Sequence, residues 1–329
     1  MKFLYKMVKA MTALGAVVAL VTFSNRPVIA ASCCGGGSSA SLVLPKFAKL
    51  MLDVSVEHEV YDGFWNSRGE FTKDPAGSDL RQLRLNAGSA FRLHDNIQMF
   101  VAIPYVINLN RYTGVQSTTY GAGDVSLGFN FELFNDIRCV YRVLSLEDLL
   151  PAAYLGAKVT LPTGISPYDN VPRSFDITGL GFYTFAASLL VDKTIKSWNL
   201  SLGASYSFSA ERPVNREYGR YIEPYKIQAG GKWNLTASTG YTFSLESMDS
   251  ITATIGYGFI KEGYARIDGK DNPLSGFQKP NLVAGLAFAT ADQNDVIKLN
   301  HSFHLPVDGW GFNRPNTNTT TLEYSHVFR

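Results

Sequence analysis

The stretch from Tyr120 to Phe134 reads Tyr-Gly-Ala-Gly-Asp-Val-Ser-Leu-Gly-Phe-Asn-Phe-Glu-Leu-Phe. From Val125 onward, apolar side chains occupy every second position and small or polar ones fall between them. Successive side chains of a strand point to opposite faces, so the stretch predicts a β-strand with one apolar and one polar face. The apolar face would carry Val125, Leu127, Phe129, Phe131 and Leu133, and the polar face Ser126, Gly128, Asn130 and Glu132.

The same alternation recurs along the rest of the chain, and the connections between the alternating stretches are long and short in turn. Long polar stretches run, for example, from Ser166 to Asp176 and from Glu262 to Lys279, and short ones from Asp192 to Ser197 and from Ala291 to Asp295. About twelve strands fit the pattern, an even number as in bacterial outer-membrane barrels. We therefore predict an all-β fold, a transmembrane antiparallel β-barrel of about 12 strands over residues 47–329.

A soluble β-sandwich would alternate as well, so the contents of the two faces must decide between the two folds. The apolar face, which we trace through Leu50, Val54, Ile227, Ala229 and Trp233 among others, contains no Asp, Glu, Lys or Arg. One lipid-facing Arg or Lys at mid-bilayer would cost about 2–4 kcal/mol. Exclusion of charge from one whole face therefore favours a wall in contact with lipid.

The opposite face carries charged residues among Gly, Ser, Thr and Asn, and in a closed barrel it would line the lumen. The lumen-lining candidates are Asp53, Glu57, Glu59, Arg84, Arg92, Glu132, Lys158, Lys232, Lys298 and Glu323. They could form a salt-bridge ladder that fills a narrow barrel, or a lining that selects solutes by charge. The strand number does not decide between these two roles, because small barrels are readily filled by their own side chains.

Two places depart from the regular pattern. The connection from Asn135 to Ala152 should be short, yet it is long, and we expect one or two helical turns in it around Ser145 to Asp148. Pro104 lies inside a predicted strand, where it lacks an N–H donor for the ladder. We therefore expect a bulge or a strand boundary at that position.

The N-terminus has the pattern of a secretory signal peptide over residues 1–31. Three lysines precede an apolar run from Ala10 to Phe23, and the small residues Ala30 and Ala31 follow. The run is too short to span a bilayer. Residues 32–46, rich in Gly and Ser, predict a flexible leader. Cleavage near Ala31 is the ordinary outcome, and lipidation of Cys33 is the alternative, because Ala30-Ala31-Ser32-Cys33 partly matches a lipobox.

Composition excludes several classes of function. Without residues 1–31 the chain has 26 Lys and Arg against 28 Asp and Glu, which gives no basic surface for nucleic acid. No later segment has the roughly 18 apolar residues of a spanning helix. The three cysteines and five histidines do not provide two Cys or His pairs at the spacing of a zinc site. We therefore expect no metal and no cofactor.

Four short motifs occur in a fixed order: Val101 to Tyr105, Gly121 to Gly128, Lys158 to Gly164 and Thr178 to Gly181. Together they resemble the outer-membrane barrel family of phenol degradation meta-pathway proteins, which are described as transporters. The resemblance covers roughly Arg84 to the C-terminus. More distantly it extends to the outer-membrane transporters of long-chain fatty acids and aromatic hydrocarbons. It implies uptake of small apolar or aromatic molecules, and the insertion near Cys139 departs from the expected pattern.

Residue chemistry does not favour an enzyme. Ser325 and His326 are adjacent on a predicted strand, which sends their side chains apart, and Gly121 to Asp124 is followed by no helix that could cradle a phosphate. We therefore expect a transporter or porin for small solutes in the cell outer membrane, surrounded by lipid and inserted by the barrel-assembly machinery. The alternative is a non-conducting structural or adhesive barrel that binds partners through its surface loops.

Overall fold

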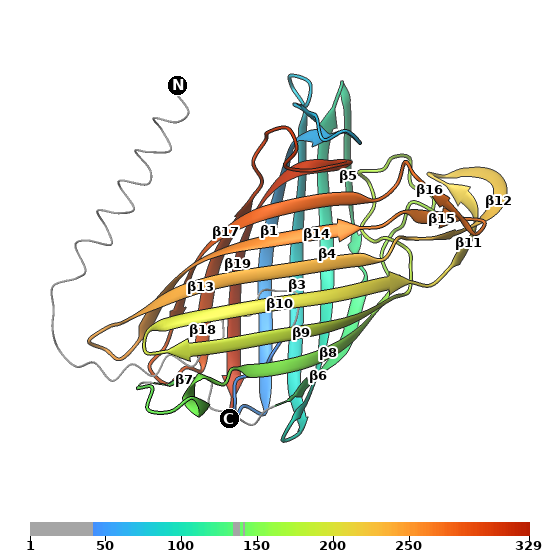
Figure 1. Ribbon diagram of the computed structural model, residues 1–329. Helices are drawn as coiled ribbons and strands as arrows, with labels where there is room; N and C mark the ends of the chain where they lie inside the picture. Colours follow the sequence, from blue (N-terminus) through green and yellow to red (C-terminus); the bar gives the residue numbers. More distant parts are fainter. Residues whose placement is uncertain (1–41, 134–138, 141) are drawn as a thin grey trace. The chain divides into compact units, whose positions relative to one another are not determined.

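The computed structural model describes residues 42–133, 139–140 and 142–329, and within them the chain forms a closed antiparallel barrel of 12 wall positions (Figure 1). Its strands are β1 (Leu50–Trp65), β3 (Asp79–His94), β4 (Ile97–Tyr112), β5 (Val115–Ala122) continued by β6 (Val125–Glu132), β8 (Ala152–Leu161), β9 (Thr184–Ile195), β10 (Trp198–Ser209), β13 (Lys232–Ser244), β14 (Ser250–Glu262), β17 (Phe277–Ala289), β18 (Asp295–Phe303) and β19 (Arg314–Phe328). The first and last strands pair from Leu50 with Phe328 to Trp65 with Arg314, which closes the wall. The predicted barrel is confirmed.

Further short elements lie outside this wall sequence. They are β2 (Phe71–Thr72), β7 (Cys139–Val140), the 3-10 helix η1 (Glu147–Leu149), and a separate sheet of β11 (Arg212–Glu217), β12 (Arg220–Gln228), β15 (Ala265–Ile267) and β16 (Lys270–Asn272). The predicted assignment of Ile227 and Ala229 to the lipid-facing wall is therefore wrong. Ile227 belongs to β12 of the separate sheet, where it pairs with Ile267, and Ala229 follows that strand.

The connections define the two ends of the barrel. The short turns that follow β3, β9, β13 and β17 lie at the end where β1 begins and β19 ends (Figure 1). Outer-membrane barrels have short periplasmic turns and longer external loops, so this end is periplasmic. The separate sheet of β11, β12, β15 and β16 stands at the opposite, external end. No described helix is long and apolar enough to cross a membrane.

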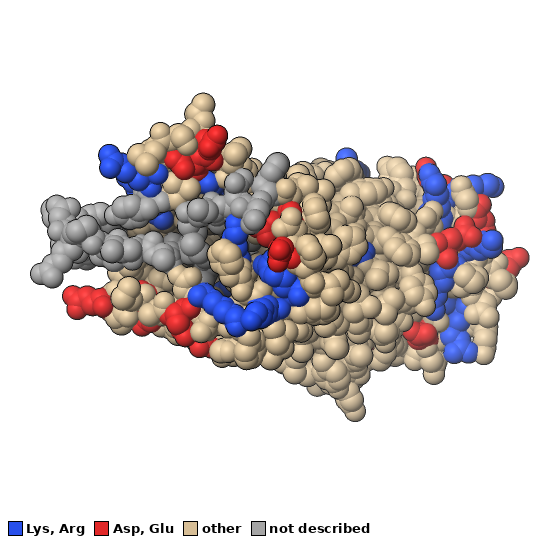
Figure 2. Space-filling model, turned by 90° about the horizontal axis from the view of Figure 1, so that it is seen from below, with Lys and Arg blue, Asp and Glu red and all other residues tan. Residues whose placement is uncertain are grey.

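The outer wall has the chemistry that lipid requires. Side chains such as Leu85, Leu202 and Leu286 are exposed along the middle of the strands, and Figure 2 shows charged side chains gathered toward the ends of the barrel with an uncharged band between them. Aromatic pairs mark both edges of the band: Tyr206 contacts Trp233 near the external end, and Trp198 contacts Tyr241 near the periplasmic end. Such girdles are typical of membrane–water interfaces.

The irregularity expected at Pro104 is present. Strand β4 pairs with β5 as far as Tyr105 opposite Ala122, and then with β6 from Ala102 opposite Ser126. The neighbouring strand therefore has one extra residue at this level, and Gly123 N–H donates to the Pro104 carbonyl over 2.8 Å. The bulge lies opposite the residue that has no donor of its own. The helix expected near Ser145 to Asp148 is the single turn η1.

Candidate functional site

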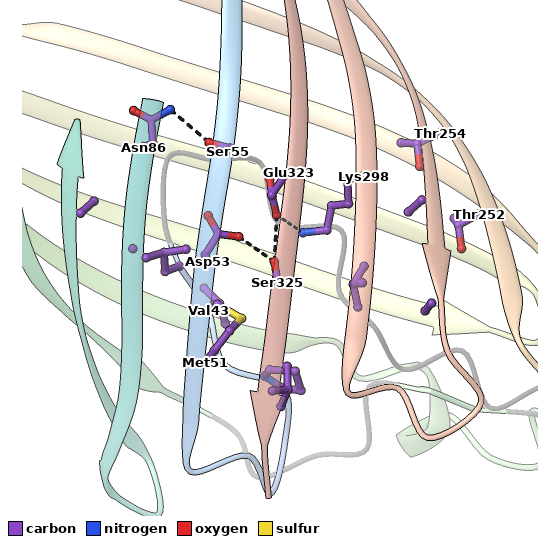
Figure 3. A pocket seen from close by; sticks show the side chains of 18 of the residues that line it. Val43, Met51, Asp53, Ser55, Asn86, Thr252, Thr254, Lys298, Glu323 and Ser325 are labelled. Atoms are coloured by element: carbon purple, nitrogen blue, oxygen red, sulfur yellow. Dashed lines mark hydrogen bonds and ion pairs between the residues drawn. The ribbon is translucent and has the colours of Figure 1, made fainter. Parts of the chain in front are cut away.

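A chamber of about 320 Å³ lies in the lumen, bounded by side chains from strands around the barrel. The part of its periplasmic floor next to β1 and β19 is apolar. The rest of the lining, including Thr194, Asn199 and Gln293 at the same end, is mostly hydroxyl and amide groups, with charges at defined places. The floor includes Val43, Met51, Val296 and Val327, and the wall includes Ser55, Asn86, Ser126, Ser238, Thr252 and Thr254. In Figure 3 Asp53, Ser325, Glu323 and Lys298 lie together on adjoining strands β1, β19 and β18. The chamber is thus amphipathic, with an apolar patch in a largely polar lining.

The charges of the lower lumen form a connected group. Ser325 Oγ donates to Asp53 Oδ2 over 2.6 Å, and Lys298 Nζ donates to Glu323 Oε1 over the same distance. Ser325 Oγ also lies 3.4 Å from Glu323 Oε1, so the hydroxyl links the two carboxylates. Asp53, Glu323 and Ser325 are buried, and all four residues line the chamber. One ammonium faces two carboxylates, which gives this wall of the chamber an acidic character.

A second charged group lies toward the external end. The Arg84 guanidinium bridges Glu57 and Glu59 on the neighbouring strand, and Lys279 Nζ donates to Thr317 Oγ1 over 2.6 Å. Arg84 and Glu57 line the chamber, so this group forms its external boundary. Since Arg84 and Lys279 together match the charge of the two glutamates, the group is balanced within itself.

His304 lies beside this charged group. It follows β18, is buried, and its Nδ1 hydrogen-bonds to the Thr317 carbonyl. Burial lowers the pKa of His304 to about 3, and the nearby Lys279 ammonium lowers it in the same direction. The imidazole is therefore neutral at neutral pH, and its Nδ1–H is the donor in the bond to Thr317.

Residues 42–49 fold into the periplasmic end of the barrel, and we refer to them as the plug segment. Leu44 and Ala48 pack against Met51, Phe100 and Val327. The segment is also held by hydrogen bonds. The Leu44 N–H donates to Gln98 Oε1 over 2.8 Å, Asn130 Nδ2 donates to the Leu42 carbonyl over 3.1 Å, and Arg92 donates to the Ala48 and Pro45 carbonyls.

A glycine of the wall makes room for the plug segment. A side chain at Gly88 would meet the Leu42 Cδ1 at 2.6 Å, a separation at which one of the two must move. Of the predicted flexible leader, residues 42–46 are described, and Leu44 within them is fully buried. The remainder of the leader lies outside the described residues.

Residues 162–183, the connection between β8 and β9, fold inward at the external end, and we refer to them as the inner loop. Asn108 and Asn110, which lie on the lumen face of β4, donate to the carbonyls of Ile177 and Phe175 over 2.8 and 2.7 Å. Ser117 Oγ of β5 donates to Asp176 Oδ1 over 2.7 Å. The loop therefore lies against the inside of the wall rather than above it.

Three of the motifs singled out in the sequence meet where the inner loop joins the bulge. The Asp124 carboxylate accepts the N–H groups of Gly164, over 3.0 Å, and Leu180, over 2.7 Å. Thr163 Oγ1 donates to the Gly123 carbonyl and accepts the Val125 N–H. These residues come from Gly121 to Gly128, Lys158 to Gly164 and Thr178 to Gly181, so the motifs form one structural clasp that fixes the inner loop.

The ten charged residues proposed from the sequence divide into three groups in the structure. Five line the chamber: Asp53, Glu57, Arg84, Lys298 and Glu323. Glu59 pairs with Arg84 just beyond it, and Arg92 lies 3.8 Å from Glu132 beside the plug segment. Lys158 and Lys232 lie on β8 and β13, where Lys232 is opposite Glu262 in the ladder. The structure thus brings five of the ten together around one space.

Other residues of the site had no distinguishing signal in the sequence. Lys279 closes a stretch that reads as a polar loop, and His304 reads as an isolated polar residue. Ser325 was considered only as a neighbour of His326. The structure sends those two side chains apart, since Ser325 contacts Asp53 in the lumen and His326 contacts Asp295, with its Nδ1 2.7 Å from Asp295 Oδ1. The described residues contain no group of three or more His, Cys, Asp or Glu that could hold a metal.

A closed barrel with an apolar outer wall and its charged groups turned to the lumen defines an outer-membrane β-barrel. Among solved structures, the chain is similar to the COG4313 outer membrane channel from Pseudomonas putida F1, with a TM-score of 0.64 and 15% identity over 90% of this chain and 100% of that one. The outer-membrane barrel fold expected from the motifs is thereby confirmed.

Weaker similarities connect the chain with other barrels. The β-domain of the Bordetella autotransporter Brka has a TM-score of 0.47 and 10% identity over 85% of this chain and 100% of that one. A Pseudomonas aeruginosa FadL homologue has a TM-score of 0.39 and 10% identity over 85% of this chain and 91% of that one. No family model matches the chain, and no curated protein matches it.

Proposed function

We propose that this chain is an outer-membrane channel that takes small solutes through its lumen and holds them transiently in the chamber. The single observation that carries the proposal is the chamber of about 320 Å³ between the plug segment and the Arg84 group. Ligand sites in proteins span about 300–1,000 Å³, and a cavity of roughly 150 Å³ accepts benzene. A single substituted ring therefore fits the space.

The lining favours solutes with one apolar and one polar end. An apolar ring would lie on the floor formed by Val43, Met51 and Val327, and a hydroxyl or amine would reach the group around Asp53 and Ser325. This agrees with the aromatic or apolar solutes that the motif resemblance implies. The charged residues then serve as the lining that selects solutes, in addition to stabilising the barrel.

Passage requires rearrangement at both ends of the lumen. The plug segment occupies the periplasmic end, and the inner loop with the Arg84 group narrows the external end. The plug segment precedes β1, and its partners in the wall include Gln98, Arg92 and Asn130. We place the gate there, and we assign the chain no enzymatic role. Its insertion by the barrel-assembly machinery is part of the same proposal.

The experiment compares two tryptophan substitutions at adjacent positions of β14. Thr254 lines the chamber, whereas Ile255 is 63% exposed on the outer wall, so the pair differs only in the face that receives the new ring. Purified protein is placed in liposomes, and the entry of benzyl alcohol and of glycerol is followed by swelling. Thr254→Trp should slow benzyl alcohol several-fold, and Ile255→Trp should not. Equal rates for the two variants would contradict the proposal.

A further inference from the structure

The connection between β6 and β8 includes residues 142–151, which we refer to as the rim insertion. It exposes several large apolar side chains, and Leu144 and Leu146 are 79% and 84% accessible. The segment is nevertheless held in one shape, because Asp148 Oδ2 accepts the N–H groups of Leu144 and Ser145 over 2.8 and 2.9 Å. An ordered segment with leucines on its surface needs an apolar phase to cover them.

The rim insertion is attached to the periplasmic end of the wall. Lys193 Nζ, on β9, donates to the Leu150 carbonyl over 2.6 Å. Backbone pairing adds to this, because β7 runs parallel to β9 with Val140 opposite Ile195, and the Lys196 N–H donates to the Val140 carbonyl. In Figure 1 the insertion lies at the lower end of β9, which is the periplasmic end. The rim insertion is thereby attached to the periplasmic end of the wall, on the side of the periplasmic leaflet.

Between the rim insertion and the wall runs a groove of about 490 Å³ on the outside of the barrel. Leu149 and Pro151 form one side of it, and outward-facing side chains of β9 and β10 form the other. Those of β9 and β10 are Val191, Lys193, Ile195, Trp198, Leu200 and Leu202. The lining is almost entirely apolar, and Trp198 belongs to the periplasmic aromatic girdle. The groove therefore extends from the girdle toward the bilayer centre, along the path of an acyl chain.

Charges of both signs occur on the segments that form this groove, and Lys193 lines it. Lys193 and Lys196 lie on or next to the end of β9, and Glu147 and Asp148 lie on the rim insertion. Lys193 Nζ donates to the Leu150 carbonyl and attracts the Asp148 carboxylate, and the lysine lines the groove, where a phosphate would approach it. Asp148 is occupied by its two backbone N–H groups, whereas Glu147 lies one residue before it on the same exposed turn.

We propose that the rim insertion and the outer wall of β9 and β10 form a binding site for one zwitterionic phospholipid of the periplasmic leaflet, of the phosphatidylethanolamine class. One acyl chain occupies the groove, the phosphate contacts Lys193 and Lys196, and the ammonium contacts Glu147. The exposed leucines of the insertion enter the leaflet beside the headgroup. This site does not depend on what passes through the lumen.

Native mass spectrometry of the purified barrel tests the site directly. Protein in detergent is mixed with equal amounts of phosphatidylethanolamine and phosphatidylglycerol, and the lipid that survives collisional activation is identified. The unaltered protein should retain one phosphatidylethanolamine, and Lys193→Gln with Lys196→Gln should reduce its retention several-fold. The matched control is Leu286→Asn, an exposed wall position on β17 far from the groove in the strand order, which should retain the lipid. Heat-dependent gel migration verifies that each variant is folded.

A second measurement uses the unaltered lysines. The bilayers contain a minor fraction of phosphatidylethanolamine whose acyl chains are brominated, because bromine quenches the fluorescence of nearby tryptophan. The difference between the unaltered protein and Trp198→Phe gives the quenching of Trp198 in the groove. The same procedure with Trp233→Phe reports the external girdle. Stronger quenching at Trp198 than at Trp233 supports the site. Equal quenching at both, equal lipid retention by the lysine variant, or preferred retention of phosphatidylglycerol overturns it.

Discussion

The imidazole of His304 is kept neutral by its surroundings in the folded protein. The side chain is buried next to the Lys279 ammonium, and its Nδ1–H is used by the Thr317 carbonyl. Burial and a like charge both disfavour the imidazolium. In the unfolded chain the same group would titrate near its ordinary pKa of 6.5. The difference between the two states makes the stability of the barrel depend on pH.

Below about pH 6.5 the unfolded state binds a proton at His304 that the folded state does not take up until near pH 3. Stability contributed by this residue is therefore full above pH 6.5 and falls as the pH drops, by at most about 1.4 kcal/mol per pH unit. Urea unfolding in lipid vesicles at pH 7 and pH 5 measures this. His304→Asn, which keeps an N–H donor without a titrating group, should lose less stability over this range. An identical pH dependence in both proteins would contradict the assignment.

For single residues, the alternation predicted which charged side chains face the lumen more reliably than it predicted their contact partners. The alternation within each strand is enough to put Asp53 and Glu323 on the lumen face. Their link through Ser325 depends in addition on the register between β1 and β19. That register joins positions more than 250 residues apart. Lys279 was missed for a different reason. It lies near the start of β17, where the polar sequence resembles a loop.

At the level of elements, the inner loop depends on the bulge between β5 and β6. The extra residue there leaves the Asp124 carboxylate in reach of the Gly164 and Leu180 N–H groups, which come from the two ends of the loop. Loops have no periodicity, so the sequence predicted the polar stretch but not its inward course. The motifs that meet at Asp124 were visible as separate pieces, and only the fold shows that they form one clasp.

Replacing Asp124 by Ala should release the inner loop. Each lost hydrogen bond to the carboxylate costs about 1.5–3 kcal/mol. We expect faster tryptic cleavage after Arg173, which lies within the loop, as measured by mass spectrometry of the folded protein in detergent. Ser126→Ala, two residues after Asp124, is the matched control, because it removes only a neutral contact with Thr160 of the neighbouring strand β8. Equal cleavage of the two variants would show that Asp124 does not hold the loop.

Similar alternation also explains why Ile227 and Ala229 were assigned to the wall. Strand β12 alternates in the same manner as a wall strand, because a hairpin with two different faces needs the same pattern. Its neighbours β11, β15 and β16 are short, and they form a sheet of their own at the external end. Strand count from alternation alone therefore cannot separate wall strands from an external hairpin. The direct backbone pairing of β10 with β13 shows that β11 and β12 are not part of the wall.

For the whole molecule, closure of the barrel follows from the environment of its two faces. Lipid excludes charge and unpaired backbone from the wall, which leaves the ionised groups to face the axis. The lumen is then narrow enough for the plug segment and the inner loop to fill much of it. The space that remains between them is the chamber, and the function proposed for the protein depends on its becoming continuous across the membrane.

Conductance in planar bilayers tests this most directly, with the mature protein and a variant that lacks residues 32–48 measured under the same salt. Among the described residues, the deletion removes Leu44 and Ala48 with their contacts. The chain of the variant resumes at Lys49, just before β1. We predict small or infrequent single-channel steps for the full protein, and larger, reproducible steps for the variant. A variant that is folded by heat-dependent gel migration, yet passes no current, would contradict the account.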